Sequence, residues 1–268
     1  MNKDYTIMGC ITKYNIDDIR PFVESIQMSG FKGKKVMMVY DIGQEVIDYL
    51  KEREWEVYGS ELQEHIIIQR FRDIYKLLDN FLDDVIIWMD VKDVIFRKDP
   101  TEWLEKHKKK EILSFSECII LKDDEWACVN TGTSFPLEWE WAKDNPSYCA
   151  GTMVADGFAL RDLFIEIYHW SRDTSNKEQL SDQAAYNILI NLNHFQENVQ
   201  FVQQEEGFIT QLGTVLIKKD VFGDKLLEPT PQLNDDGTIT NQNGTMFCVV
   251  HQYDRDPKLK ELYLNKYK

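Results

Sequence analysis

Asp90 and Asp93 are two carboxylates at the end of an apolar run, Val85 to Met89, and their types and spacing suggest chemistry. An apolar run bounded by charges predicts a buried strand of a parallel sheet, and open α/β sheets bind ligands at the carboxyl ends of such strands. Hard divalent cations such as Mg²⁺ or Mn²⁺ prefer oxygen ligands, so the pair predicts a metal site. Isolated Asp-x-x-Asp pairs also solvate ordinary strand-to-loop corners, and other segments must decide.

The elements that must position this corner alternate between strand-like and helix-like runs through the first hundred residues. The expected strands are 5–11, 35–40 and 55–58, and the expected helices are 17–28, 44–53 and about 67–80. This order predicts βαβ units around a parallel sheet.

After Pro100 the alternation becomes irregular, although no linker-like break divides the chain. The expected elements are a short helix at 101–107, a strand at 112–115, helices at 158–170 and 182–192, a surface loop at 229–244 and an apolar strand at 246–250. A single domain is therefore simpler than two.

Composition limits the classes of function. The 268 residues are 43% hydrophobic and 12% aromatic, as expected of a folded globular protein. The formal net charge of −15 argues against nucleic-acid binding and against adsorption to anionic lipid, since both need a positive surface. An anionic ligand would need local help from a bound cation and a few Arg or Lys residues.

Cysteine use and targeting signals predict the compartment. Five widely spaced cysteines, mostly in apolar segments, are typical of free thiols in a reducing compartment: Cys10, Cys118, Cys128, Cys149 and Cys248. Neither a bilayer-spanning apolar stretch nor a signal peptide is recognisable. We therefore expect a cytoplasmic protein without a transmembrane segment.

The acidic corner resembles the metal-binding motif of nucleotide-sugar glycosyltransferases of the GT-A fold, usually Asp-x-Asp after a hydrophobic strand. The apolar continuation Val94 to Phe96 and the Asp99–Pro100 pair match that motif. The spacing here is Asp-x-x-Asp, as in the glycosyltransferase domain of collagen lysyl hydroxylases. The resemblance implies an α/β, Rossmann-like GT-A fold with a central mixed, mostly parallel sheet flanked by helices.

The resemblance implies a third metal ligand, because GT-A enzymes often take one from a His near the C-terminus. His251 follows the apolar strand at 246–250. With Asp90 and Asp93 it would bind Mn²⁺ or Mg²⁺, and Arg255 would help to neutralise a diphosphate. Taken alone, His251 would more often be a strand-end residue without a metal, and Arg255 a surface charge.

Donor-binding residues are implied in the same way. The segment Tyr148-Cys149-Ala150-Gly151 resembles the Tyr-x-Asn-x-Gly-type strand beneath the donor sugar, with Cys149 where many members have Asn. Gly151 is equally well explained as a tight packing glycine. Asp90 would also contact the donor, through the metal.

Such folds hold the nucleoside after the first two strands, where Thr12, Tyr14 and Asp41 stand. Tyr14 could stack on the base, and Asp41 could accept a hydrogen bond from base or ribose. A basic residue on the helix before the acidic strand often meets the donor, which indicates Arg72 and Lys76. Solvated face charges are the alternative for these two.

Asp182 and Gln183 resemble the Asp-Gln pair that opens a helix pointing at the sugar, although Ser181 or Asp182 is also what a helix N-cap uses. The resemblance implies that Asp182 contacts the donor or the acceptor and that Gln183 faces the anomeric centre. An inverting enzyme needs a carboxylate base, for which Asp182 is the first candidate and Asp156 the second. A retaining enzyme would need none.

The tryptophan-rich stretch at 126–141 has two explanations. Trp126, Trp139 and Trp141 can cover the core, which is the commoner use of indoles. Alternatively, an aromatic face can serve as a platform for the C–H face of a pyranose.

These expectations combine into one domain, 1–268, with a nucleotide-sugar donor half at about 1–100 and an acceptor half with the metal-binding C-terminal segment at about 101–268. We expect a metal-dependent glycosyltransferase that moves a sugar from a nucleoside diphosphate to a hydroxyl acceptor such as a glycan. The alternatives are a sugar-nucleotide nucleotidyltransferase and a non-catalytic carbohydrate-binding protein. Gly-x-Gly-x-x-Gly and P-loop fingerprints are absent from the sequence.

Overall fold

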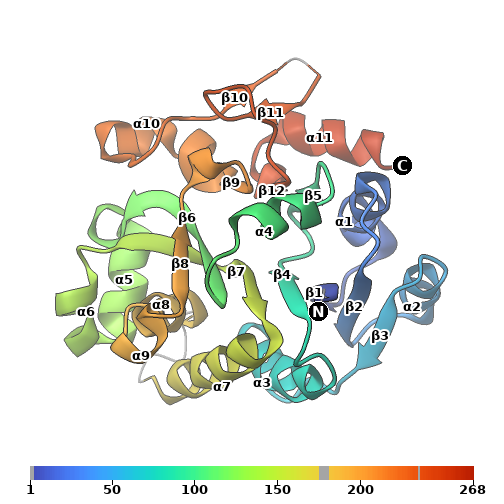
Figure 1. The fold of residues 1–268 in the computed structure, drawn as a ribbon, viewed down its shortest axis with the longest axis horizontal. Coiled ribbons are helices and arrows are strands. Elements are labelled where there is room, and N and C mark those ends of the chain that lie inside the picture. The colour runs from blue at the N-terminus through green and yellow to red at the C-terminus, as the bar shows by residue number, and fades with distance from the viewer. Residues whose placement is uncertain (1–2, 175–180, 235) are drawn as a thin grey trace.

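A seven-stranded sheet forms the centre of the computed structural model, which describes residues 3–174, 181–234 and 236–268 (Figure 1). In sheet order the strands are β3 (Glu56–Gly59), β2 (Lys34–Tyr40), β1 (Tyr5–Thr12), β4 (Val85–Met89), β7 (Pro146–Asp156), β6 (Ile112–Ile120) and β8 (Val199–Val202). Neighbouring strands run parallel except at β7, which is antiparallel to β4 and β6. The predicted mixed, mostly parallel α/β sheet is therefore confirmed.

Helices cover both faces of this sheet (Figure 1). They are α1 (Ile16–Ser29), α2 (Gln44–Lys51), α3 (Ile66–Leu77), α4 (Thr101–His107), α5 (Glu125–Ser134), α6 (Pro136–Ala142), α7 (Gly157–Asp173), α8 (Asp182–Leu189), α9 (Asn193–Gln196), α10 (Lys219–Phe222) and α11 (Pro257–Lys266). In the first half they begin and end within about two residues of the predicted positions, apart from the final 3₁₀ turn after α3.

A second, three-stranded sheet joins segments that are far apart in the sequence. Its central strand β12 (Val249–His251) pairs antiparallel with β5 (Val94–Phe96) and parallel with β9 (Ile209–Gln211). The predicted strand at 246–250 is wrong at its start, because regular pairing begins at Val249. The predicted loop at 229–244 contains two short antiparallel strands, β10 (Gln232–Leu233) and β11 (Ile239–Thr240).

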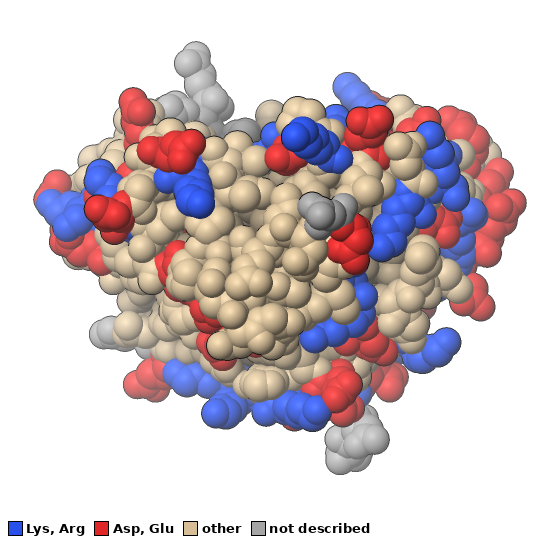
Figure 2. Space-filling model, turned by 90° about the horizontal axis from the view of Figure 1, so that it is seen from above, with Lys and Arg blue, Asp and Glu red and all other residues tan. Residues whose placement is uncertain are grey.

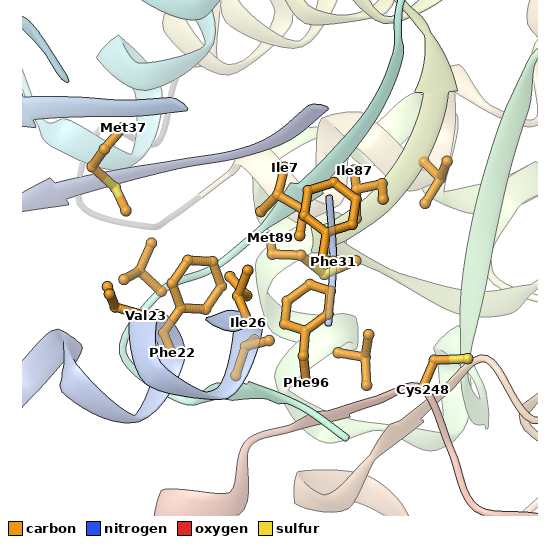
Figure 3. Packing of buried hydrophobic residues seen from close by; sticks show 14 of the residues in the cluster. Ile7, Phe22, Val23, Ile26, Phe31, Met37, Ile87, Met89, Phe96 and Cys248 are labelled. Atoms are coloured by element: carbon orange, nitrogen blue, oxygen red, sulfur yellow. The ribbon is translucent and has the colours of Figure 1, made fainter. Parts of the chain in front are cut away.

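Alternating side chains on the central strands fill two cores, one on each face of the sheet. Ile7 and Ile87 lie on the face covered by α1, where they pack with Phe22 (Figure 3). Met8 and Trp88 lie on the opposite face, beneath α3 and α7. The same two strands are thereby held from both sides, which fixes the position of their carboxyl ends.

Charged side chains of both signs are interspersed around a largely uncharged central area on the face seen in Figure 2. That face carries no continuous basic surface, in keeping with the net charge of −15. Within residues 3–174, 181–234 and 236–268, no helix is long and apolar enough to cross a membrane.

The aromatic packing beneath α7 gives a stability prediction. Phe164 is fully buried and meets Trp88 edge-on, with 5.2 Å between ring centroids. We expect Phe164→Ala to lower the free energy of unfolding by about 3–5 kcal/mol through lost packing and a residual cavity. On the same helix Phe158 is 59% exposed, so Phe158→Ala should change it by less than about 0.5 kcal/mol. Urea denaturation of both variants measures the difference, and equal losses would contradict this packing.

Candidate functional site

The two sheets bring the predicted metal ligands together. Asp90 follows the last residue of β4, and its N–H donates to the Gly151 carbonyl of β7 over 2.6 Å. Asp93 precedes β5, and the antiparallel pairing of β12 with β5 sets His251 opposite Val94. A strand from near the C-terminus therefore places an imidazole beside an acidic corner that lies about 160 residues earlier in the sequence.

The three side chains form a compact donor set. His251 Nε2 lies 3.4 Å from Asp93 Oδ1 and 4.0 Å from Asp90 Oδ2. One ligand atom from each residue lies within 4.8 Å of the others. A hard cation bound about 2.1 Å from each ligand holds them roughly 3 to 4.2 Å apart, so the chemistry and the spacing suit a divalent ion.

A buried glutamine orients the imidazole. His251 Nδ1 lies 2.6 Å from Gln211 Oε1, and Gln211 Nε2 donates to Thr152 Oγ1 over 2.9 Å. Because the amide oxygen can only accept, Nδ1 carries the proton and donates it, while Nε2 faces the two carboxylates. A ligating histidine is commonly held by a hydrogen bond of this kind from its other ring nitrogen. Gln211 was not predicted from the sequence.

Electrostatics at the corner favour positive charge. Burial opposes protonation of His251, but the adjacent Asp93 carboxylate and then the Cys149 thiol more than offset it and raise the His251 pKa well above its usual value. Burial would raise the Asp93 pKa, yet the nearby imidazole lowers it overall. Two carboxylates facing a buried imidazole thus stabilise a positive charge between them, whether a proton or a metal cation carries it.

Gly151 makes room for the acidic corner. A Cβ atom at this position would lie 2.1 Å from Asp90 Oδ2, far inside van der Waals contact. Any larger residue would displace the carboxylate or the strand. The close approach of the Asp90 carboxylate therefore explains why residue 151 is a glycine.

Arg70 ties the acidic corner to a second carboxylate. Its guanidinium donates to Asp90 Oδ1 over 2.7 Å and to Asp182 Oδ2 over 2.9 Å. Burial raises the Asp182 pKa, although the Arg70 charge acts in the opposite direction. The sequence analysis instead predicted Arg72 and Lys76, on the same helix, as the basic residues that meet the donor. A signal was available, because Arg70 lies between Ile67 and Ile74 on the apolar face of that helix.

Glu117 is a further buried carboxylate that sequence reasoning missed. Its Oε2 accepts hydrogen bonds from Ser147 Oγ over 2.7 Å and from Gln183 Nε2 over 2.8 Å. Burial raises its pKa, against the effect of the Ser147 hydrogen bond. Irregular pairing along β6 and a left-handed residue, Cys118 (φ 60°), interrupt the strand here, and no sequence pattern marks such a position.

The four carboxyl groups, the His251 imidazole and the Arg70 guanidinium described above line a cavity of about 660 Å³. The lining residues that were predicted from the sequence are Thr12, Tyr14, Asp90, Asp93, Gly151, Asp182, Gln183, His251 and Arg255. The Thr12 hydroxyl oxygen is buried without a hydrogen-bond partner, as expected of a group that awaits a ligand. Arg255 reaches the cavity beside Gly213, where a Cβ atom would come within 2.6 Å of its guanidinium.

Four predicted residues do not line the cavity: Asp41, Arg72, Lys76 and Asp156. Arg72 pairs instead with Glu64, which precedes α3, and with the neighbouring Asp73, and Lys76 is exposed one turn later. Asp41 stands just after β2, one strand further from β4 than β1.

Asp156 was the second candidate base, and the structure separates it from the other site residues. It pairs with Val85 at the start of β4, whereas Asp90 follows the end of that strand. Its carboxylate binds Lys3 and Lys108. Because β7 runs antiparallel to β4, Asp156 lies beside the start of β4, whereas Gly151 lies beside the residue that follows its end.

The glutamine that orients His251 gives the second prediction. Gln211→Leu keeps the volume but removes the acceptor for Nδ1–H, so Mn²⁺ affinity should fall by about tenfold to a hundredfold. Isothermal titration with Mn²⁺ measures the affinity directly. Gln27→Leu on the exposed side of α1 is the matched control and should leave it unchanged. Equal affinities for both variants would remove Gln211 from the metal centre.

Comparison with protein-family models finds no match, and comparison with curated proteins finds none either. Solved structures do match. The galactosyltransferase LgtC, in complex with donor and acceptor sugar analogs, aligns with a TM-score of 0.58 and 14% identity over 96% of this chain and 95% of LgtC. The glycosyltransferase GlyE of Streptococcus pneumoniae TIGR4 aligns with a TM-score of 0.59 and 14% identity over 99% of this chain, which spans 63% of GlyE. The chain therefore has the GT-A fold of these glycosyltransferases.

Proposed function

We propose that the protein is a metal-dependent glycosyltransferase that moves a sugar from a nucleoside diphosphate to a hydroxyl acceptor. One observation carries the proposal: Asp90, Asp93 and His251 converge, with the imidazole oriented by Gln211, in a cavity at the carboxyl edge of a GT-A sheet. Ligands of open α/β sheets bind at that edge.

Asp90, Asp93 and His251 would hold the divalent cation, Mn²⁺ or Mg²⁺. A bound cation neutralises the negative charge that develops on a diphosphate leaving group. Arg255 lines the same cavity and adds a positive charge that does not depend on the ion. In a protein of net charge −15, such local cations are what allow an anionic donor to bind.

Residues around Arg70 would position the sugar. The guanidinium holds the Asp182 carboxylate on the same side of the cavity as Asp90, where it can accept hydrogen bonds from donor hydroxyls. Glu117 accepts from Gln183 Nε2, so the Gln183 amide oxygen would be free to interact with the donor sugar. One comparison structure is an active-site glutamine-to-glutamate mutant of LgtC. Gln183 is the candidate for a comparable position here.

The nucleoside would bind beyond the metal centre, at the end of β1. Thr12 offers an unpartnered hydroxyl and Tyr14 an aromatic ring at this end of the cavity. Lys92, between the two acidic ligands, lies 5.2 Å from the centre of the Tyr14 ring. These three residues supply a hydroxyl, an aromatic face and a cation.

Metal-dependent nucleotide binding tests the proposal. We expect uridine or guanosine diphosphate at about a hundred times its dissociation constant to raise the melting temperature by about 5 °C or more with Mn²⁺, and far less with EDTA. Thermal shift measures this. A carbohydrate-binding protein would show no response to either nucleotide. A nucleotidyltransferase would turn over a sugar phosphate with a nucleoside triphosphate.

Asp93→Asn provides the accompanying variant. It should abolish the Mn²⁺-dependent part of the shift and lower hydrolysis of the donor sugar nucleotide by about a hundredfold or more, because a charged ligand is lost. Asp83→Asn on an exposed turn is the matched control. Retained Mn²⁺-dependent hydrolysis in Asp93→Asn would contradict the assignment.

A further inference from the structure

Trp126 is a large aromatic side chain placed at the mouth of the cavity. It lines the cavity and is 44% exposed. Trp139, by contrast, is partly buried and packs beside Gly132 in the α5–α6 hairpin. Trp141 is 45% exposed but does not line the cavity. Core packing therefore accounts for Trp139 and leaves the exposed indole of Trp126 unexplained.

The order of the strands places Trp126 opposite the nucleoside end. Across the sheet the order is β1-β4-β7-β6. Tyr14 follows β1, Asp90 follows β4, and Trp126 follows β6. The metal ligands consequently lie between two aromatic residues, one on each side. If the donor occupies the β1 side, the space beside Trp126 is left for the second substrate.

Tertiary contacts hold the start of α5, the helix segment that carries the indole of Trp126. Asp124 is buried and caps α5 by accepting a hydrogen bond from the backbone N–H of Trp126 over 3.2 Å. Lys218 Nζ donates to Asp124 Oδ1 over 3.3 Å, which links α5 to the segment before α10. Thr214, from the π-helical turn Gly213–Ile217 that precedes Lys218, also lines the cavity. The position of Trp126 is thus set by tertiary contacts rather than by its helix alone.

The chemistry of this group matches a sugar ring. An indole face packs against the apolar C–H face of a pyranose, while a carboxylate, an ammonium and a hydroxyl exchange hydrogen bonds with its hydroxyls. The Lys218 ammonium at this side of the cavity is already paired with Asp124, so it is not a free partner for an anionic ligand. The chemistry therefore suits an uncharged sugar better than an acidic one.

We propose that Trp126, with Asp124, Lys218 and Thr214, forms the acceptor subsite, and that it takes a neutral pyranosyl glycan whose ring stacks on the indole. This rests on the proposed glycosyl transfer, because the β1 side of the cavity is assigned to the donor. Trp126 is then a specificity-determining residue that contacts the acceptor and does not contact the nucleotide.

Saturation-transfer NMR with cellotriose, maltotriose, lactose and chitotriose tests the subsite in the presence of Mn²⁺ and uridine diphosphate. We expect at least one of these neutral saccharides to bind, with saturation concentrated on the C–H groups of one ring face. Trp126→Ala should weaken that binding by about tenfold or more, whereas Trp126→Phe should retain part of it. Trp141→Ala is the matched control, since it removes an equally exposed indole away from the cavity.

The nucleotide-dependent thermal shift is measured on the same variants and keeps the two proposals distinguishable. Trp126→Ala should leave the Mn²⁺-dependent shift with nucleoside diphosphate unchanged. A normal shift together with no saccharide binding, or with equal binding by Trp126→Ala and wild type, would overturn the acceptor subsite alone. Loss of the nucleotide shift in wild type would overturn the proposed function, whatever the saccharides do.

Discussion

The antiparallel pairing of β12 with β5 is the contact on which the candidate metal centre depends. It sets His251 opposite Val94 and adds a backbone hydrogen bond from the Gln252 N–H to the Asp93 carbonyl over 2.7 Å. Pairing with β9 on the other side brings Gln211 to the same imidazole. Three short strands, each of three residues, therefore define both the position and the tautomer of one ligand.

The larger sheet supplies the rigid base for this arrangement. Its strands are packed on both faces, so the end of β4 has little freedom, and Gly151 on β7 leaves the volume that the Asp90 carboxylate occupies. Arg70 then couples Asp90 to Asp182 by sharing its guanidinium between the two carboxylates. A buried arginine with two acidic partners keeps its charge, and removing Arg70 would leave the buried Asp182 carboxylate without its ion-pair partner.

Much of the fold could be predicted because local patterns agreed with the tertiary structure. Apolar strands such as Val85–Met89 and helices with a clear apolar face have a periodicity that can be read directly. The end of β6 could not be predicted, since its register shifts at Ser116 and the alternation is lost. The bounds of β12 and the existence of the short strand β9 are set by their pairing partners rather than by their own residues.

The same distinction applies to the cavity. Residues adjacent to a strong strand, such as Asp90 and Asp93, were found from the sequence, whereas Gln211 and Glu117 lie in short or irregular segments and were missed. Arg72 and Lys76 were preferred over Arg70, although the helical spacing of Arg70 with Ile67 and Ile74 places it on the apolar face of α3. The face of α3 decides between them, and that face is set by packing on the sheet.

The unequal exposure of the three candidate metal ligands has a kinetic consequence. The His251 side chain is 2% exposed, while those of Asp93 and Asp90 are 20% and 33% exposed, and all three line the cavity. An ion would enter and leave from the cavity side, because protein atoms enclose the imidazole elsewhere. A molecule seated over the carboxylates blocks that exit, so ion release would have to wait for it to depart.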